Sequence, residues 1–229
     1  MSNPQTTFAT ANIGMFFNSC RRRSYKAKRV IIHSGDRSNS LFYILSGSVA
    51  VIAEDSDGKE ITLAYLNSGD FVGEMGLFEK NRRSARIRAK TECELAEISY
   101  RKFFALSAKH PELMFAIARQ ISMRLAHTSR KACDLAFLDV SGRVASALMD
   151  LCREPDAVKK PSGIHIRITR REIAKLVGCS REMAGRILKD LEAKQLISPH
   201  GKTVVVLNKS RRRLSDANVT QTPFSQKSV

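Results

Sequence analysis

The sequence TRREIAKLVGCSREMAGRILKDLEAKQL, residues 169–196, decides how the C-terminal part of the chain folds. Apolar or small residues recur along it at the spacing of two short helices, and the two patterns meet at Gly178. Glycine adopts the positive φ of a tight turn without a Cβ clash. The small side chain of Ala174 lets two helices cross closely. The stretch therefore predicts a helix-turn-helix.

The second predicted helix carries a polar outer face that suits DNA. Ser180 is a good N-cap, which places Arg181 and Glu182 in the first turn. That turn of a recognition helix meets base edges, where arginine can donate to guanine and a carboxylate can accept from cytosine. Arg186 and Lys189 continue the same face. On these residues alone, a helical hairpin with a solvated charged face is the alternative.

The charge of the chain favours a polyanionic partner. The net charge of the 229 residues is +17, which points to nucleic acid first and an anionic membrane surface second. Residues 159–213 contain 15 Lys or Arg against 4 Asp or Glu, so the charge is concentrated around the helix-turn-helix. No apolar run approaches the roughly 18 residues of a membrane helix, and no signal peptide pattern is present. We expect a cytoplasmic protein with no membrane partner.

The cysteines and histidines predict neither a metal site nor a catalytic one. The five cysteines are scattered and include no CxxC pair, which argues against a zinc site or a disulfide framework. The five histidines do not cluster, and no HExxH spacing occurs. The chain is therefore expected to bind no metal and not to be an enzyme.

From Val30 to Ile98 the pattern consists of short β-rich runs. Four glycines, each preceded by Ser or Asp, separate these runs at intervals of 12, 11 and 11 residues. Such regular punctuation is typical of an antiparallel sandwich, barrel or roll, and Asp57-Gly58 is a strong hairpin signal. We expect an antiparallel β-roll whose interior is either filled or holds a ligand.

One segment interrupts this rhythm. Residues 74–78 are predicted to form a single helical turn between strands, and the free N–H groups of such a turn, beside a glycine such as Gly73, can receive a phosphate. Arg83 adds a charged partner and Ser84 a hydroxyl donor. Glu74 fits this basic site if it accepts a hydrogen bond from a sugar hydroxyl. Phosphate plus ribose would satisfy the whole set, whereas a loop with a solvated arginine is the simpler alternative.

A long helix without glycine is predicted from about His110 to Ala136. Apolar residues form a heptad-like seam along it, which suits a two-stranded coiled coil, although packing on the β-roll would explain the seam as well. The seam residues are Met114, Ile117, Ile121, Leu125, Thr128, Ala132 and Leu135. Thr128 is the polar exception, with Ser129 beside it. The two side chains could set the register or contact a ligand held between helix and roll.

The C-terminal part of the chain reads as a winged helix. Phe137, Leu138 and Asp139 are expected to form a hinge at a domain boundary, with a further helix from about Val140. Residues 154–162 read as a polar loop, and residues 164–168 alternate like a strand. A hairpin over residues 197–207 would close the helix-turn-helix. Residues 209–229 are polar and aperiodic and are expected to be disordered.

In this order the elements resemble the CRP/FNR family, the cyclic-nucleotide-responsive transcription regulators, over residues 12–208. The segments that carry the resemblance are GSVAVIAE (47–54), YLNSGDFVGEMGLFE (65–79), RSARIRAKT (83–91), LAFLDVSGR (135–143) and VGCSREMAGRILK (177–189). The resemblance implies an α+β fold with a cyclic-nucleotide-binding β-roll (12–109), a dimerisation helix (110–137), a winged helix-turn-helix (138–208) and a disordered tail (209–229).

The resemblance implies cyclic AMP as an allosteric ligand. Gly73 and Glu74 match the family's ribose and phosphate contacts, and Arg83 and Ser84 match its phosphate-binding pair. Some relatives bind cyclic di-GMP instead, and their recognition helix looks like Ser180 to Arg186 here. Those relatives lose the Arg-Ser-Thr-Ser set that this chain keeps, so cyclic AMP is favoured.

The remaining ligand contacts implied by the resemblance lie on the long helix and in the roll. Thr128 and Ser129 match residues that contact adenine, one from each subunit of a homodimer. Leu63 and Val51 would line the base and sugar pocket. Arg86 replaces an aromatic residue of the family and is expected to alter the polarity of the pocket.

The resemblance also implies the contacts with double-stranded DNA. Arg181, Glu182 and Arg186 match the residues that read bases, and Thr169 and Arg170 match contacts to the phosphate backbone. A DNA-bending protein that responds to no ligand is an alternative within the same fold.

Contacts with RNA polymerase are expected from a second basic region. Arg21, Arg23 and Lys102 match the family's contact surface and keep or raise its positive charge. Lys159 and Lys160 depart from the residues usual in another contact loop, so the resemblance does not carry that contact over.

Overall fold

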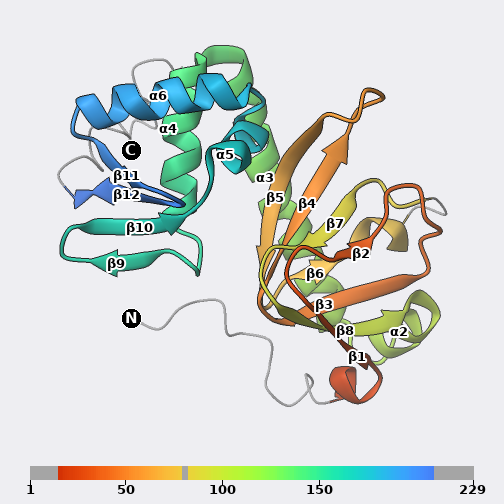
Figure 1. Cartoon of the computed structure of the whole chain (residues 1–229). Coiled ribbons are helices and arrows are strands. Elements are labelled where there is room, and N and C mark those ends of the chain that lie inside the picture. The colour runs from red at the N-terminus through yellow and green to blue at the C-terminus, as the bar shows by residue number, and fades with distance from the viewer. Residues whose placement is uncertain (1–14, 79–81, 209–229) are drawn as a thin grey trace, which may run out of the picture. The chain divides into compact units, whose positions relative to one another are not determined.

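The computed structural model describes residues 15–78 and 82–208 (Figure 1). The chain divides into two compact units, residues 1–127 and residues 128–229. The division falls within one long helix, α3 (Glu112–Phe137). The domain bounds drawn from the sequence stay a prediction, and the tail from residue 209 onward lies outside the described residues.

The first unit is built on two antiparallel four-stranded sheets, as the sequence predicts. One has the strand order β1-β8-β3-β6 and the other β2-β7-β4-β5. Their strands are β1 (Arg21–Tyr25), β2 (Val30–Ile32), β3 (Ser40–Ser46), β4 (Ser48–Glu54), β5 (Glu60–Asn67), β6 (Phe71–Val72), β7 (Arg86–Ala89) and β8 (Cys93–Ser99). Residues from both sheets, among them Ile44, Val49 and Leu95, are fully buried in one core. Gly58 has a φ of 75° in the turn that joins β4 to β5, which explains the Asp-Gly hairpin signal.

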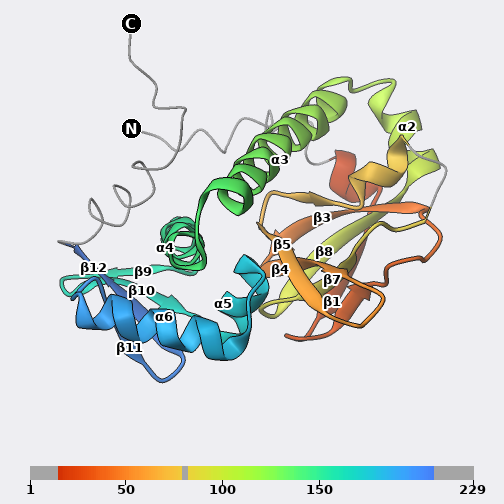
Figure 2. The same cartoon turned by 90° about the horizontal axis from the view of Figure 1, so that it is seen from above.

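Helical segments cover part of this unit. The single turn predicted after β6 is present as a 3₁₀ helix, η1 (Glu74–Leu77). Helix α2 (Tyr100–Ser107) follows β8 and lies beside the first turns of α3 (Figure 2). Buried Leu113 and Ile117 of α3 pack with Phe71 and Phe103 in a second core, so the start of α3 is fixed to the sheet that contains β6.

The second unit is a winged helix-turn-helix. It contains α4 (Val140–Leu151), β9 (Val158–Lys160), β10 (Gly163–Arg167), α5 (Arg170–Val177), α6 (Arg181–Ala193), β11 (Ile197–His200) and β12 (Thr203–Leu207). The strands form one antiparallel sheet with the order β11-β12-β10-β9. Helices α4, α5 and α6 gather over one face of that sheet (Figure 1). The core between them includes Leu148, Ile173, Leu188 and Val206.

The turn between α5 and α6 has the features that its sequence predicts. Gly178 ends α5 with φ 69° and ψ 47°, the left-handed conformation that favours glycine. The Ser180 hydroxyl accepts a hydrogen bond from the Met183 N–H at 3.1 Å and so caps α6. Ala174 and Ala184 are buried where the helices meet, because small side chains allow the close crossing.

Helix α3 ends at Phe137, next to the predicted hinge. Leu138 and Asp139 link it to α4, and the Asp139 carboxylate accepts from the Gly142 N–H at 2.7 Å as the N-cap of α4. The Arg143 guanidinium donates to the Leu138 carbonyl oxygen at 3.0 Å and to that of Val177 at 3.3 Å. The short link therefore has defined hydrogen bonds, and motion about it stays a prediction.

Two polar segments form strands that the sequence did not predict. The basic segment at Arg21 is the edge strand β1, held by β8 in antiparallel register. The segment interpreted as a polar loop over residues 154–162 contains β9, which pairs with β10. The loop interpretation was wrong for Val158–Lys160 because both strands lie at sheet edges, where exposed polar side chains mask the alternation of a half-buried strand.

Candidate ligand pocket and nucleic-acid interface

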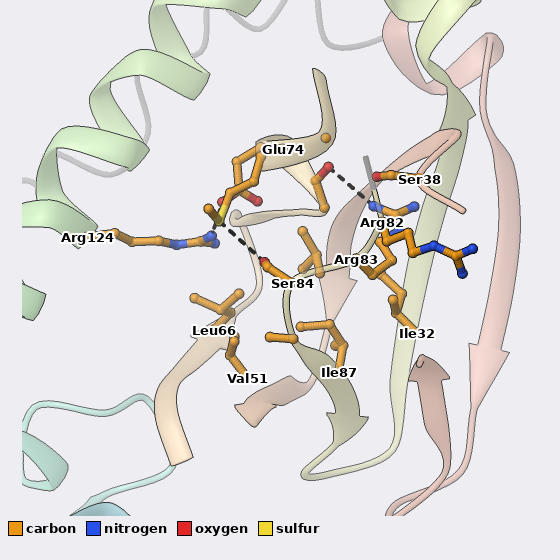
Figure 3. Close-up of a pocket in the computed structure, with 15 residues that line it drawn as sticks. Ile32, Ser38, Val51, Leu66, Glu74, Arg82, Arg83, Ser84, Ile87 and Arg124 are labelled. Carbon is orange, nitrogen blue, oxygen red and sulfur yellow. Dashed lines mark hydrogen bonds and ion pairs between the residues drawn. The ribbon is translucent and has the colours of Figure 1, made fainter. Parts of the chain in front are cut away.

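A cavity opens within the β-roll and brings together five of the eight predicted ligand residues. The five are Val51, Gly73, Glu74, Arg83 and Ser84. The space measures about 560 Å³, including its open mouth. Figure 3 shows apolar Val51, Leu66 and Ile87 on one side of the pocket and the charged side chains above them.

Arg83 is the buried cation of this pocket, with 8% of its surface exposed. Its Nη2 donates to the Ser40 carbonyl oxygen at 2.6 Å, and its Nη1 donates to the Tyr100 hydroxyl at 3.0 Å and to the Gly73 carbonyl oxygen at 3.3 Å. The guanidinium also lies 5.8 Å from the centre of the Tyr100 ring. The structure thus holds this positive charge in a fixed position at the pocket.

Position 73 requires glycine for two reasons, the conformation of the turn and the nearby Arg83 side chain. Gly73 has a φ of 83°, which side-chain-bearing residues rarely adopt. A Cβ built at this position would overlap the Arg83 guanidinium. The glycine therefore makes room for the buried arginine, a reason that sequence inspection did not find.

Glu74 faces a charge supplied by α3. Only 4% of Glu74 is exposed, and its carboxylate forms an ion pair with Arg124. Figure 3 shows Arg124 reaching from α3 toward Glu74 at the edge of the pocket. Arg124 also donates to the Phe71 carbonyl oxygen at 2.6 Å. Sequence inspection missed Arg124, since its position on the helix did not show that it lines the pocket.

Tyr100, Ser38 and Gly76 form a polar layer behind Arg83 that the sequence also did not reveal. The Tyr100 hydroxyl donates to the Gly73 carbonyl oxygen at 2.6 Å and lies 2.7 Å from the Ser38 hydroxyl. A Cβ on Gly76 would overlap both hydroxyls, so this second glycine of the turn is required as well. The only available signal was the repeated glycine in GEMG, residues 73–76.

The other predicted ligand residues do not line the cavity. Leu63 is 44% exposed on β5, where the pairing with β4 shifts register. Thr128 and Ser129 are exposed on α3, in the second unit. Ser84, unlike these three residues, lines the cavity, and its hydroxyl is 3.7 Å from the sulfur of Met75. The ligand roles of all these residues stay predictions.

Arg86 does not change the polarity of the pocket, contrary to the expectation from the sequence. Its neighbour Ile87 lines the cavity, and successive side chains of a strand point to opposite faces. Arg86 forms ion pairs with Glu54, at 2.9 Å, and with Glu60. Its charge is therefore compensated on the face of the sheet that is turned away from the pocket.

Helix α6 presents the predicted DNA-reading face. Arg181, Glu182, Arg186 and Lys189 are all exposed. The opposite face of the helix buries a row of small and apolar residues, namely Ala184, Ile187, Leu188 and Leu191. The burial of one face fixes the rotation of the helix, so the charged side chains point to solvent.

The start of α5 holds the two predicted backbone-phosphate contacts. Thr169 forms a capping box with Glu172, in which the Thr169 hydroxyl is already hydrogen-bonded. Arg170 is exposed in the first turn and passes close to Gly185 of α6. Arg170 therefore lies next to the recognition helix, while the Thr169 side chain mainly stabilises the end of α5.

The three predicted polymerase contacts are exposed on the first unit. Arg21 and Arg23 lie on β1, and Arg23 donates to the Glu97 carboxylate at 2.6 Å. Lys102, in the first turn of α2, is near Cys20, just before β1. Burial raises the pKa of the Cys20 thiol to about 12, an effect that the Lys102 charge partly opposes. Lys102 is thus near the start of β1, where Arg21 lies, and Arg23 lies two residues further along the strand.

Within the described residues, no group of three or more His, Cys, Asp or Glu side chains could hold a metal ion. No helix of residues 15–78 and 82–208 is both long and apolar enough to span a membrane.

Comparison with known proteins agrees with both units. Residues 22–110 match the cyclic nucleotide-binding domain, and residues 142–213 match the Crp-like helix-turn-helix domain. The chain is 56% identical over 191 residues to the cAMP-activated global transcriptional regulator Vfr of Pseudomonas aeruginosa, covering 82% of this chain and 89% of Vfr. It is 50% identical over 207 residues to the cAMP-activated global transcriptional regulator CRP of Salmonella typhimurium, covering 90% of this chain and 97% of that protein.

A solved structure gives the same result. The c-di-GMP responsive global regulator CLP of Xanthomonas campestris superposes with a TM-score of 0.82 at 46% identity, covering 86% of this chain and 99% of CLP. The similarity extends over both units. The chain therefore belongs to the CRP/FNR family of transcription regulators.

Proposed function

We propose that this protein is a homodimeric transcription regulator that binds palindromic promoter DNA in response to cyclic AMP. The buried Arg83 carries the proposal, because this fixed cation lines the same pocket as the Glu74 carboxylate and the apolar side chains of the roll. A cyclic phosphate would accept hydrogen bonds from the Arg83 guanidinium, and the ribose hydroxyl would donate to the Glu74 carboxylate. The base would contact apolar side chains.

Two observations bear on the choice between cyclic AMP and cyclic di-GMP. The relatives at 50% and 56% identity are named as activated by cAMP, whereas CLP, at 46%, is named for its response to c-di-GMP. The pocket holds one deeply buried arginine, Arg83, which matches one phosphate rather than two. Cyclic AMP is therefore the first candidate and cyclic di-GMP the second.

Ile117 of the predicted seam is buried against the roll, whereas the later part of the seam is exposed and supports the homodimer. Leu125 is 66% exposed and Leu135 is 56% exposed, although both are large apolar side chains. A second copy of α3 packed along this seam would remove them from water, as in a two-stranded coiled coil. Thr128, in the same seam, would then lie where a nucleotide can contact both subunits.

The proposed mechanism links this pocket to DNA. A ligand shifts a conformational equilibrium only through its higher affinity for one of the states. Nucleotide binding would favour the state in which the two α6 helices are about 34 Å apart and so fit successive major grooves. The change would act through the link of Leu138 and Asp139. Arg21, Arg23 and Lys102 would then contact RNA polymerase bound next to the protein.

The decisive experiment measures binding to a palindromic DNA site at increasing concentrations of each cyclic nucleotide. We expect tight, specific binding only with cyclic AMP at micromolar concentrations. If only cyclic di-GMP increases DNA binding, cyclic di-GMP and not cyclic AMP is the ligand. Equal binding without any nucleotide would indicate a DNA-bending protein that needs no ligand.

Removal of the Tyr100 hydroxyl is expected to weaken cyclic AMP binding without unfolding the protein. Tyr100→Phe keeps the ring but loses the hydrogen bonds that orient Arg83 and the Gly73 carbonyl group. A net loss of about 1 kcal/mol, roughly fivefold in Kd, is expected from calorimetry. The ratio of affinities for the two phosphorothioate diastereomers of cyclic AMP should also change, because it reports the direction of the guanidinium.

Tyr25→Phe is the matched control, since it removes a phenol hydroxyl from β1, outside the pocket lining. If Tyr100→Phe and Tyr25→Phe bind both diastereomers like the unmodified protein, Tyr100 has no part in orienting Arg83.

A further inference from the structure

We propose that Gln120 is a positioning residue that links α3 to the Gly73–Glu74 turn. Because this turn would bind phosphate and ribose, the binding of a nucleotide in the pocket would be transmitted to α3. The proposal rests on the nucleotide-responsive function proposed above. Gln120 does not line the pocket. It acts on the backbone of β6, the strand that leads directly into Gly73 and Glu74.

Gln120 completes the open edge of a sheet. Strand β6 is at the end of the order β1-β8-β3-β6, and on its inner side Val72 pairs with Phe42 of β3. On the other side, the Phe71 N–H donates to Gln120 Oε1 at 2.6 Å, and Gln120 Nε2 donates to the Phe71 carbonyl oxygen at 2.8 Å. A primary amide offers one acceptor and two donors. The side chain therefore takes the place of a neighbouring strand.

Arg124 makes a second contact one helical turn later. Residues four apart share one face of a helix, and Arg124 donates to the same Phe71 carbonyl oxygen while it pairs with Glu74. Helix α3 thus holds both the strand before Gly73 and the carboxylate after it. The Nε of Arg124 is buried without a hydrogen-bond partner, so polar contacts fix this side chain through its terminal nitrogens alone.

The two contacts have different consequences. Arg124 binds Glu74 through a long side chain that can follow a small shift of the carboxylate. Gln120 fixes the backbone at Phe71, so a shift of the Gly73–Glu74 turn has to move α3 or break two hydrogen bonds. Without Gln120, the turn could adjust to a nucleotide while the helix stays in place. Gln120 should therefore matter more for the response than for nucleotide affinity.

The test is Gln120→Met in the full-length protein. Methionine keeps the length and packing of the side chain and removes both hydrogen bonds. Calorimetry gives the Kd for cyclic AMP without DNA, and titration of a palindromic site gives the ratio of DNA affinities with and without saturating cyclic AMP. We expect that ratio to fall by about tenfold, a typical coupling energy, while the nucleotide Kd stays within about threefold. Hydrogen exchange at the Phe71 amide should become faster.

Arg119→Met is the matched control, because Arg119 is the preceding residue of α3, is exposed and lies outside the apolar seam. Gln120→Glu is the second variant. Its carboxylate can accept from the Phe71 N–H but repels the carbonyl oxygen and competes with Glu74 for Arg124. We expect it to lose the same coupling and, unlike Gln120→Met, to weaken nucleotide binding as well.

The outcomes separate this proposal from the proposed function. If the unmodified protein binds DNA equally with and without cyclic AMP, the proposed function fails. If the unmodified protein responds and Gln120→Met responds to the same extent despite faster exchange at Phe71, the hydrogen bonds serve only local stability and the role of Gln120 is refuted. Equal losses of nucleotide affinity and coupling would also refute it, because Gln120 would then act through the pocket alone.

Discussion

Replacement of Arg83 by leucine is expected to abolish the response to cyclic AMP at micromolar concentrations. Arg83 is the buried cation of the pocket, and its position is fixed by Ser40, Gly73 and Tyr100 before any ligand arrives. Truncating one partner of a buried, hydrogen-bonded charge pair costs about 2–5 kcal/mol. The Kd for cyclic AMP in calorimetry should therefore rise by at least about thirtyfold.

Arg88→Leu is the control for this loss. Arg88 is on β7, five residues after Arg83, and is partly exposed, with its guanidinium 3.8 Å from Glu60 and outside the pocket lining. This variant removes the same charge and should keep nearly unchanged affinity. DNA binding without nucleotide should be the same in both variants. A Kd for Arg83→Leu that matches that of the unmodified protein would exclude this arginine as the phosphate ligand.

Replacement of Arg181 by alanine is expected to weaken specific DNA binding while non-specific binding stays nearly unchanged. Arg181 begins α6 directly after the Ser180 cap, so its side chain is exposed at the end of the helix that approaches the bases. A bidentate contact to guanine is worth about 1–3 kcal/mol of discrimination. In titrations with saturating cyclic AMP, the free energy of binding to the palindromic site should weaken by about 1–3 kcal/mol. The affinity for unrelated DNA should change little.

The salt dependence of binding tests the alternative role. If Arg181 contacts a phosphate, its loss should weaken binding to every sequence and lower the salt slope by about one. Lys194→Ala is the control, because Lys194 is an exposed cation at the other end of α6. An equal loss for specific and unrelated DNA would show that Arg181 does not read a base.

The parts of the fold that could be predicted from sequence are those that local chemistry determines. Gly178 and Ser180 define the helix-turn-helix, because one adopts a left-handed turn and the other caps α6. The Asp-Gly pair at Gly58 likewise predicts its hairpin. Strands β1 and β9 escaped prediction because they lie at sheet edges with exposed polar side chains, so neither shows the alternation of a half-buried strand.

The candidate pocket was predicted only where its residues are close together in the sequence. Glu74 and Arg83 lie in the segment that breaks the β rhythm, so their chemistry stood out. Tyr100 contacts Arg83 from 17 residues away in the sequence, and Arg124 contacts Glu74 from 50 residues away. No local sequence pattern predicts these contacts. Gln120 is 49 residues from the strand that it holds. Only the packing of α2 and α3 on the roll brings these three side chains to the site.

Because a Cβ at position 73 would overlap the Arg83 guanidinium, the identities of these two residues are coupled in evolution. A mutation of Gly73 displaces the arginine at once, and later changes at position 83 can then accumulate without further cost to binding. Once both residues have changed, restoring either one alone does not restore the fixed cation, so their effects on binding are strongly non-additive. A lineage that loses this glycine is therefore expected to retain its DNA-binding unit and evolve a different ligand rather than regain the first one.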